Sequence, residues 1–362
     1  MKKYLKLALA ILVLGLSVAI FFILRREKCN ASFYGNDSVW AVVDFGSYSD
    51  AEEEMFGPGY DYELLKMMAS DFGSNVEISF GKPGESWIDS LEQGVVDIVA
   101  LPSGLGIESR DSVHISKVVD DFSVWLVRNK KNLKEVNSWI GEYNLSERQD
   151  SVRARFLTPF EPFWDVRNGV TRAVLSPYDD LIKEYAEEID WDWLLLASVI
   201  FQESRFRIEA RSGKDAEGLM QMIPATSGRY DVDNLFDPEQ NIKAGVSHIR
   251  RLQRMFSGCA KNKVELRKMA LAAYNAGEGH IQDCINLARV NQMEYGTWED
   301  LCVILPEFQN PEISQVDTVK CGPFKSAETV KYIKRIYDIY WAFQKIYSPT
   351  QPALSEQDQP LR

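Results

Sequence analysis

The stretch Leu194-Leu-Leu-Ala-Ser-Val-Ile-Phe-Gln-Glu-Ser204 is a run of large apolar residues that ends in one carboxylate. This pattern predicts a buried helix with Glu203 close to its end. A carboxyl group among apolar neighbours loses hydration in its charged form, so the pKa of Glu203 is expected to be raised. A carboxyl group that keeps its proton at neutral pH can act as a general acid. Glu203 is therefore the candidate catalytic residue, and the alternative is a Glu that only marks a polar helix end.

Four motifs follow one another from Glu203 onward. They are Glu203-Ser204, then Ser212 with Gly218-Leu-Met-Gln221 and Pro224-Ala-Thr226, then Ala273-Tyr-Asn-Ala-Gly277, and finally Glu328-Thr-Val-Lys-Tyr-Ile333. Their order over roughly 130 residues resembles the transglycosylase domain of the soluble lytic murein transglycosylase family, which shares the goose-type lysozyme fold. One such motif alone would be weak, but four in sequence are specific.

The resemblance implies an all-α lysozyme-like domain over residues 177–347 that acts on peptidoglycan glycan strands without a cofactor. By resemblance, Glu203 protonates the oxygen between N-acetylmuramic acid and N-acetylglucosamine and then takes the proton of the muramoyl C6 hydroxyl. The product would carry a 1,6-anhydro ring, and no water would be consumed. Each further residue assigned to substrate binding also has a purely structural alternative, such as a loop hydrogen bond or core packing. These residues are Ser212, Met220, Gln221, Tyr274, Asn275 and Tyr332.

Two other functions remain open for the same domain. A lysozyme-type muramidase would need a second carboxylate as base or nucleophile. The nearby acids Glu209, Asp215 and Glu217 lie in a segment that is expected to be a solvated loop. The third possibility is a non-catalytic wall-binding or sensor protein that uses the fold as a glycan clamp.

Upstream, residues 32–145 alternate between predicted strands and helices. The strands are 39–45, 76–80, 96–101 and 122–128, and the helices are 60–73, 87–94 and 133–140. Successive βαβ units of this kind predict a parallel sheet.

This α/β part resembles the first lobe of periplasmic solute-binding proteins of the amino-acid-binding type. Only about twenty residues separate Leu101 from Phe122, so the second lobe is expected to be missing and the domain to be truncated. A single lobe cannot bury a small ligand from both sides, and free amino acids should bind poorly. A wall peptide or a protein partner is the expected occupant instead.

Residues 7–24 carry no charge and are long enough to span a bilayer. Residues 1–31 are thus a membrane anchor or a cleaved signal, and the charged cluster at 25–28 favours the anchor because it follows the apolar run directly. A solute-binding-like domain ahead of a transglycosylase domain resembles the membrane-bound lytic transglycosylases. This resemblance implies a place in the cell envelope, on the periplasmic side of a bacterial membrane.

Composition excludes several other classes. The net charge of -12 opposes binding to nucleic acid, which requires clustered Lys and Arg. The three histidines are scattered, so no metal site is predicted. Four cysteines fall in the C-terminal domain, where they can pair outside the cytoplasm: Cys259, Cys284, Cys302 and Cys321. Residues 146–176 are expected to form a linker that packs through its aromatic side chains, and residues 348–362 a disordered tail.

Overall fold

The computed structural model describes residues 32–33, 35, 38–48, 57–81, 87–105, 110–156 and 161–348. The chain divides into two compact units, Met1–Pro159 and Phe160–Arg362, which are called unit 1 and unit 2 below. The predicted anchor or signal at 1–31 and the predicted tail beyond Ser348 lie outside the described residues. Among the residues described, no helix is both long and apolar enough to cross a membrane.

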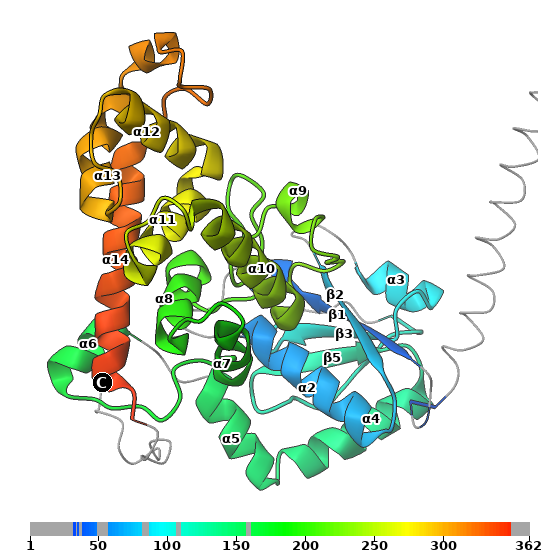
Figure 1. Cartoon of the computed structure of the whole chain (residues 1–362). Coiled ribbons are helices and arrows are strands. Elements are labelled where there is room, and N and C mark those ends of the chain that lie inside the picture. The colour runs from blue at the N-terminus through cyan, green and yellow to red at the C-terminus, as the bar shows by residue number, and fades with distance from the viewer. Residues whose placement is uncertain are drawn as a thin grey trace, which may run out of the picture. The chain divides into compact units, whose positions relative to one another are not determined.

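Unit 1 is built on a five-stranded sheet with the order β2-β1-β3-β5-β4 (Figure 1). Its strands are β1 (Val39–Asp44), β2 (Val76–Gly81), β3 (Ile98–Pro102), β4 (His114–Ile115) and β5 (Ser123–Val127). The strand β1 pairs in parallel with both β2 and β3, as the βαβ pattern predicts. The strand β5 pairs antiparallel with β3 and β4, so the sheet as a whole is mixed. The parallel pairing predicted from the βαβ units is thus present in β1, β2 and β3.

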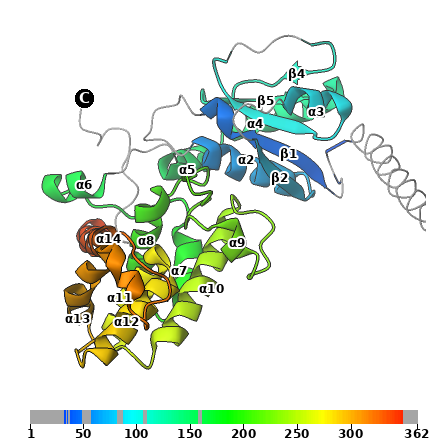
Figure 2. The same cartoon turned by 90° about the horizontal axis from the view of Figure 1, so that it is seen from above.

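Helices cover the two faces of this sheet (Figures 1 and 2). They are α2 (Gly57–Asp71), α3 (Trp87–Gln93), α4 (Lys130–Tyr143) and α5 (Glu147–Phe156), and a short 3-10 helix, η1 (Phe45–Tyr48), follows β1. On one face Leu91 of α3 packs in a core cluster with Val42 and Val99. On the other, Asp61 of α2 accepts hydrogen bonds from the Ser123 hydroxyl at 2.6 Å and the Trp125 indole at 2.8 Å. The alternation of side chains along each strand sends neighbouring residues to opposite helices.

The chain leaves the sheet at the end of β3 and returns at the start of β5 through a closed turn. The backbone N–H of Ser103 donates to the Phe122 carbonyl at 2.8 Å, which joins the two ends of the excursion. Within the turn, Asp120 and Asp121 both have positive φ, at 53° and 57°. Within the part of this excursion that the structure describes, the strand β4 is two residues long. No second lobe can be built from so short a segment.

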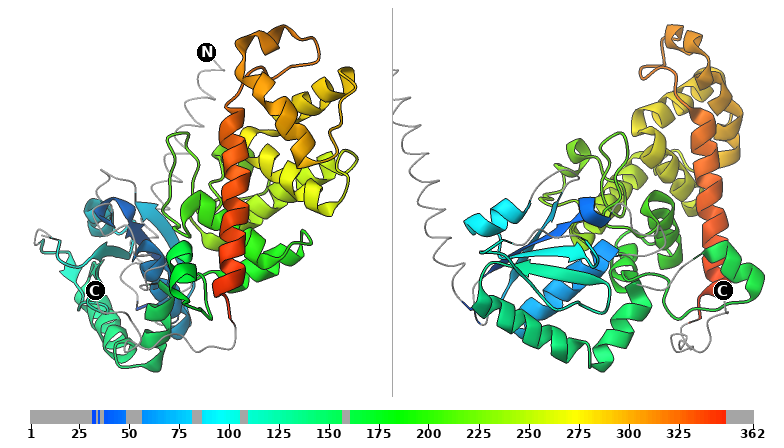
Figure 3. Two further views of the ribbon diagram at one scale, coloured as in Figure 1. Left: turned by 90° about the vertical axis from the view of Figure 1, so that its left-hand side faces the viewer. Right: turned by 180° about the vertical axis from the view of Figure 1, so that it is seen from behind.

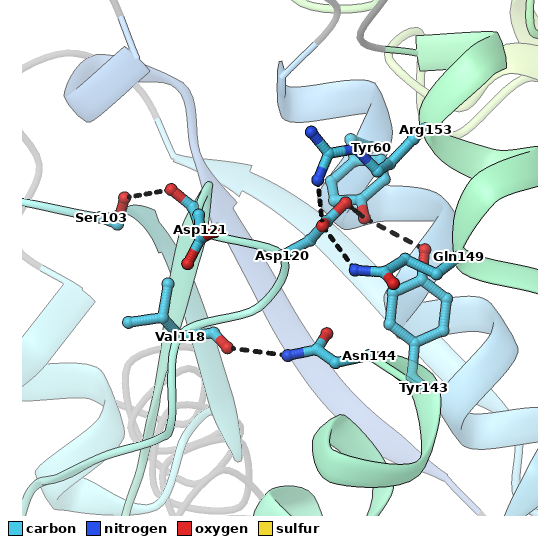
Figure 4. A network of polar contacts seen from close by, with 9 residues as sticks. All are labelled: Tyr60, Ser103, Val118, Asp120, Asp121, Tyr143, Asn144, Gln149 and Arg153. Carbon is cyan, nitrogen blue, oxygen red and sulfur yellow. Dashed lines mark hydrogen bonds and ion pairs between the residues drawn. The ribbon is translucent and has the colours of Figure 1, made fainter. Parts of the chain in front are cut away.

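A buried network around Asp120 holds this turn in place (Figure 4). Tyr60 of α2 donates to Oδ2 of Asp120 at 2.7 Å and lies 3.0 Å from the hydroxyl of Tyr143 of α4. Gln149 and Arg153 of α5 donate to Oδ1 at 2.6 and 2.5 Å. The Asp120 side chain is only 1% exposed, so these donors replace the water that a buried carboxylate lacks. The network fastens three helices to the turn.

The segment predicted as a linker contains two helices. The helix α5 belongs to unit 1 through its contacts with Asp120. The helix α6 (Pro162–Asn168) belongs to unit 2, where the buried Asp165 accepts from the Arg172 guanidinium at 2.6 Å.

Unit 2 is helical, as predicted. Its helices are α6, α7 (Asp179–Glu187), α8 (Trp193–Ser204), α9 (Pro224–Ser227), α10 (Pro238–Phe256), α11 (Lys263–Ala276), α12 (Glu278–Val290), α13 (Trp298–Ile304) and α14 (Ser326–Ile346), and the 3-10 helices η2 (Leu305–Gln309) and η3 (Pro311–Gln315) lie between α13 and α14. The long helix α14 runs along this unit and packs against α8, α11 and α6 (Figure 3). The helix α8 is buried at eight consecutive positions, from Leu194 to Phe201.

Candidate active site

The apolar run of α8 delivers Glu203 to one end of the helix. The Asp192 side chain caps the start of α8 by accepting from the Leu194 N–H at 2.9 Å. At the other end, Arg205 and Phe206 both adopt positive φ, at 53° and 64°, and turn the chain away. Glu203 lies in the last turn and is half-buried. The predicted helix and its terminal carboxylate are both present.

The carboxyl group of Glu203 has one hydrogen-bond donor from a distant part of the chain. The hydroxyl of Tyr332 on α14 donates to Oε1 of Glu203 at 2.5 Å. Burial raises the pKa of Glu203 to about 7, while the Tyr332 hydrogen bond acts in the opposite direction by stabilising the carboxylate. At neutral pH the group is therefore close to half protonated. It can both give and take a proton without a large energetic cost.

Tyr274 of α11 is the second aromatic residue near this acid. Its hydroxyl donates to the Met220 carbonyl at 2.6 Å and lies 3.2 Å from Sδ of Met222. Burial raises the pKa of Tyr274, and the negative charge of Glu203 raises it further. Burial and the same charge also raise the pKa of Tyr332. Three helices thus bring Glu203, Tyr274 and Tyr332 together, and both tyrosines remain neutral donors.

The Gly-Leu-Met-Gln motif forms a tight turn under Tyr274. Gly218 has a φ of 75°, and a Cβ there would come within 2.1 Å of the Leu235 carbonyl oxygen. Gln221 also has positive φ, and its amide donates to the carbonyls of Ala210 and Gly218, each at 3.0 Å. The turn therefore requires positive φ at two positions of the motif, and Gly218 is needed because a Cβ has no room there.

Met220 lies inside the domain beneath this turn. Its side chain is 0% exposed. A Cβ on Gly245 of α10 would approach its Sδ to 2.3 Å, so the two residues fit closely. Its backbone N–H donates to Asn241 Oδ1 at 2.7 Å. In the described part of the chain, Met220 is therefore a core residue.

Ser212 and Asn275 make local contacts around the site. Ser212 is exposed, and its hydroxyl oxygen accepts from the N–H groups of Lys214 at 3.2 Å and Ala216 at 3.1 Å. Asn275 is exposed at the end of α11, and its Oδ1 accepts from the Thr329 hydroxyl at 2.9 Å. The structure thus joins Tyr332 directly to Glu203. The described hydrogen bonds of Ser212, Gln221 and Asn275 go to other groups.

The acids downstream of Glu203 are only partly a solvated loop, which corrects the sequence expectation. Glu209 is 12% exposed and pairs with Arg207 at 2.7 Å, and Glu217 is 21% exposed and lies 3.5 Å from Arg211. Only Asp215 is exposed. Among the described residues, no other carboxylate contributes to the raised pKa of Glu203. The raised pKa of Glu203 is thus an effect of burial and not of a neighbouring negative charge.

Sequence reasoning missed a group of residues beside Tyr274. His248 of α10 packs its ring against Tyr274 with centroids 5.5 Å apart, and its Nδ1 lies 3.0 Å from the Tyr230 hydroxyl. Arg251 of α10 donates to Glu278 at the start of α12 at 2.6 Å. The spacing of His248 and Arg251, three residues apart on one helix, was the available signal.

Cys259, Cys284, Cys302 and Cys321 are free thiols, so the pairing that the sequence left open for them is absent from the structure. Across the residues that the structure describes, no cluster of three or more His, Cys, Asp or Glu side chains is arranged to hold a metal ion.

Comparison with known proteins identifies the class of the helical unit. Residues 180–294 match the family model of the transglycosylase SLT domain. Unit 2 therefore contains an SLT-type, lysozyme-like helical domain, and the predicted all-α lysozyme-like fold is confirmed.

The curated relatives that the chain resembles share one name. The chain is 29% identical over 292 residues to membrane-bound lytic murein transglycosylase F of Desulfosudis oleivorans, which covers 78% of this chain and 64% of the relative. It is 33% identical over 162 residues to the protein of the same name in Maricaulis maris, covering 45% of this chain and 35% of the relative. The chain thus spans less than two thirds of the length of these relatives.

Among solved structures, lytic transglycosylase Slt of Pseudomonas aeruginosa shares 23% identity at a TM-score of 0.34. That match covers 51% of this chain and 26% of the other chain. At this score the superposition adds nothing to the fold assignment. The likeness of unit 1 to a solute-binding lobe stays a prediction.

Proposed function

We propose that the chain is a peptidoglycan lytic transglycosylase with Glu203 as its only catalytic carboxylate. The observation that carries this proposal is the pairing of one acid, whose pKa is raised to about 7, with a tyrosine donor at 2.5 Å. The SLT family match and the transglycosylase relatives support the same reaction class. A hydrolase of the two-carboxylate type would need a second acid flanking the scissile bond.

The reaction proceeds in two proton transfers through one residue. Protonated Glu203 gives its proton to the glycosidic oxygen between N-acetylmuramic acid and N-acetylglucosamine, and the bond from that oxygen to muramoyl C1 breaks. The Glu203 carboxylate then removes the proton of the muramoyl C6 hydroxyl, whose oxygen bonds to C1. The products are a free N-acetylglucosamine 4-hydroxyl and a 1,6-anhydro-muramoyl end. Glu203 regains its proton, and no water is consumed.

The tyrosines support this cycle by electrostatics and by shape. Tyr332 stabilises the carboxylate that exists between the two transfers, because its hydroxyl donates to Oε1. Tyr274 donates a hydrogen bond to the Met220 carbonyl and so holds in place the turn that carries Gln221. Ser212, Gln221 and Asn275 are proposed to contact the glycan, since each presents polar groups near the end of a site helix or turn. Met220 is proposed to shape the wall of the groove from beneath.

A digest of purified sacculi tests the substrate, the reaction and the product together. The parent protein should release muropeptides with 1,6-anhydro ends, which mass spectrometry separates from hydrolysed ends heavier by one water. The Glu203→Gln variant should lose about 10²–10⁴-fold in rate, the range expected for a general acid. Glu187→Gln, an exposed acid on α7, serves as the matched control and should cleave like the parent. Reducing ends that carry the extra water would instead indicate a muramidase.

We also propose that the protein works in the cell envelope, held to the membrane by residues 1–31 with its two units on the periplasmic side. The uncharged run at 7–24 supports this, together with relatives whose name includes membrane-bound. The protein should fractionate with membranes and keep its N-terminal segment. N-terminal sequencing of the mature chain that starts near Ser32 would contradict the anchor.

Unit 1 is proposed to position unit 2 or to dock a wall peptide or protein partner. The short excursion between β3 and β5, closed by the Ser103 hydrogen bond and the Asp120 network, supports a role without a two-lobed ligand cleft. Its resemblance to a solute-binding lobe would then be one of scaffold and not of ligand.

A further inference from the structure

Beside Tyr274, unit 2 carries a concentration of positive charge that the proposed reaction does not use. Arg251 and Arg254 lie three residues apart on α10, and Arg229 precedes Tyr230 in the loop that leads to this helix. Glu278 is the acidic partner in the group, bonded to Arg251 at 2.6 Å. Asp231 and Asp233 follow Arg229 in the same exposed loop, and the net charge of the chain is -12. This group of Arg229, Arg251 and Arg254 is called the arginine cluster below.

Contacts link the arginine cluster to the catalytic group. The Tyr230 hydroxyl lies 3.0 Å from His248 Nδ1, and the His248 ring packs 5.5 Å from that of Tyr274. The charge of Glu203 acts on Tyr274 in turn. Tyr230, His248 and Tyr274 therefore form a row of contacting side chains between the loop that carries Arg229 and the helix α11.

The charges of all three arginines act on the Tyr230 hydroxyl. Burial raises the pKa of Tyr230, and the charges of Arg251, Arg229 and Arg254 each oppose that rise. Burial also lowers the pKa of His248, so the imidazole is neutral at pH 7 and adds no further charge. The positive charge beside Tyr230 and His248 therefore comes from the arginines.

The arginine cluster has hydrogen-bond donors that are not used within the described residues. One guanidinium nitrogen of Arg251, Nη1, is buried without a hydrogen-bond partner, although the other bonds Glu278. Arg229 and Arg254 are exposed, and no ion pair involves either of them within the described ranges. A buried donor without a partner is costly, and a planar fork of N–H groups matches a carboxylate in geometry.

We infer that the arginine cluster binds a carboxylate carried by the muramoyl unit of the glycan strand. The inference rests on the proposed function, because the sugar rings of peptidoglycan are neutral and their acidic groups sit on the muramoyl substituent. Two sources supply this chemistry: the lactyl carboxylate of a strand without peptides, or the free carboxylates of an attached stem peptide. Either carboxylate would bind to the arginine cluster beside Tyr274 and would set the position of the glycan strand relative to Glu203.

Binding in the Glu203→Gln background tests the cluster independently of catalysis. Soluble glycan strands would be prepared in three forms: with stem peptides, with stem peptides removed by an amidase, and with all carboxyl groups converted to neutral amides. The third form should bind about 5-fold more weakly than whichever carboxylate source the cluster uses, since an exposed charge pair is worth about 1 kcal/mol. Added salt should weaken binding to the charged form only.

The variant Arg229→Gln/Arg254→Gln removes two exposed arginines that have no described ion pair, and so spares the fold. It should prefer the charged strands less strongly than the Glu203→Gln protein does, and its salt dependence should be weaker, because only Arg251 of the cluster remains. Lys243→Gln, an exposed cation on α10, is the matched control and should behave like the parent. If the double variant still prefers the charged strands as strongly as the Glu203→Gln protein does, the inference is wrong. Absence of anhydro products from the parent would overturn the proposed reaction alone, because the binding comparison does not require cleavage.

Discussion

At the scale of single residues, the chemistry depends on how one carboxyl group is tuned by two opposing influences. Burial at the end of α8 raises the pKa of Glu203, and the hydroxyl of Tyr332 lowers it again. The outcome, about 7, is near the optimum for a group that must act first as an acid and then as a base. Neither influence alone would produce this value.

Removing the Tyr332 hydroxyl should shift the pH profile of cleavage upward. In the parent, kcat/KM should fall as pH rises through about 7, because the first step needs protonated Glu203. In Tyr332→Phe the carboxylate loses its donor, so this basic limb should move up by about one pH unit, while the maximal rate falls because the carboxylate of the second step is less stable. The rate of release of anhydro-muropeptides between pH 5 and 9 measures both effects. An unchanged basic limb would mean that Tyr332 does not set the pKa.

The same group makes folding stability depend on pH. The pKa of Glu203 is higher in the folded than in the unfolded chain, so the folded state binds the proton more tightly and stability is lost as pH rises from about 4.5 through about 7. Glu203→Gln, which cannot ionise, should exceed the parent in unfolding free energy by about 2–3 kcal/mol at pH 8 and by less than about 1 kcal/mol at pH 5. Urea unfolding at the two pH values measures the difference. Equal stability at pH 8 would show that Glu203 ionises there at no cost.

At the scale of elements, the sequence was most informative where local pattern and tertiary role agree. The helices α2, α3, α4 and α8 were anticipated from the sequence to within a few residues, and so were the strands β1, β2, β3 and β5. The helix α5 was missed because it is highly charged, and only Val152 and Phe156 are buried. Its position depends on the long-range contacts of Gln149 and Arg153 with Asp120, which no local pattern reveals.

The site followed the same division. Glu203 and its raised pKa were predictable, because a carboxyl group at the end of a buried apolar helix is poorly hydrated in its charged form. The contact of Tyr332 with Glu203 spans 129 residues of sequence, and spacing alone could not give it. His248 and Tyr230 were missed because their importance arises from packing against Tyr274.

The close fit between α10 and the Gly218–Gln221 turn gives a prediction for one element. Gly245→Ala places a Cβ 2.3 Å from Met220 Sδ, and Met220 is fully buried and cannot easily move. The crowding should cost about 1–3 kcal/mol and exceed the gain in helix propensity of about 1 kcal/mol. Thermal unfolding measures the loss, and cleavage activity should fall with it because the turn moves. Gly258→Ala, where a Cβ meets no atom within 4 Å, is the control and should unfold like the parent.

At the scale of the whole molecule, unit 1 gives a prediction about ligands. The excursion between β3 and β5 is closed by Ser103 and by the buried contacts of Asp120, so no opposing wall is built from it. Free amino acids should not bind the full chain, because burial from both sides supplies most of the affinity of a small-ligand cleft. Isothermal titration calorimetry with a panel of single amino acids checks this. Micromolar binding of any of them would show that unit 1 keeps a working cleft.

The bond between Tyr332 and Glu203 also determines when during biosynthesis the chain can become active. The acid is synthesised 129 residues before its partner, and α14 must dock along α8 before the pair exists. A nascent chain that has not yet produced α14 carries the carboxylate without its tuned environment, and a chain cut short before residue 332 never gains it. If Glu203 acts as proposed, the chain therefore gains its activity only after α14 has been made and has packed against α8.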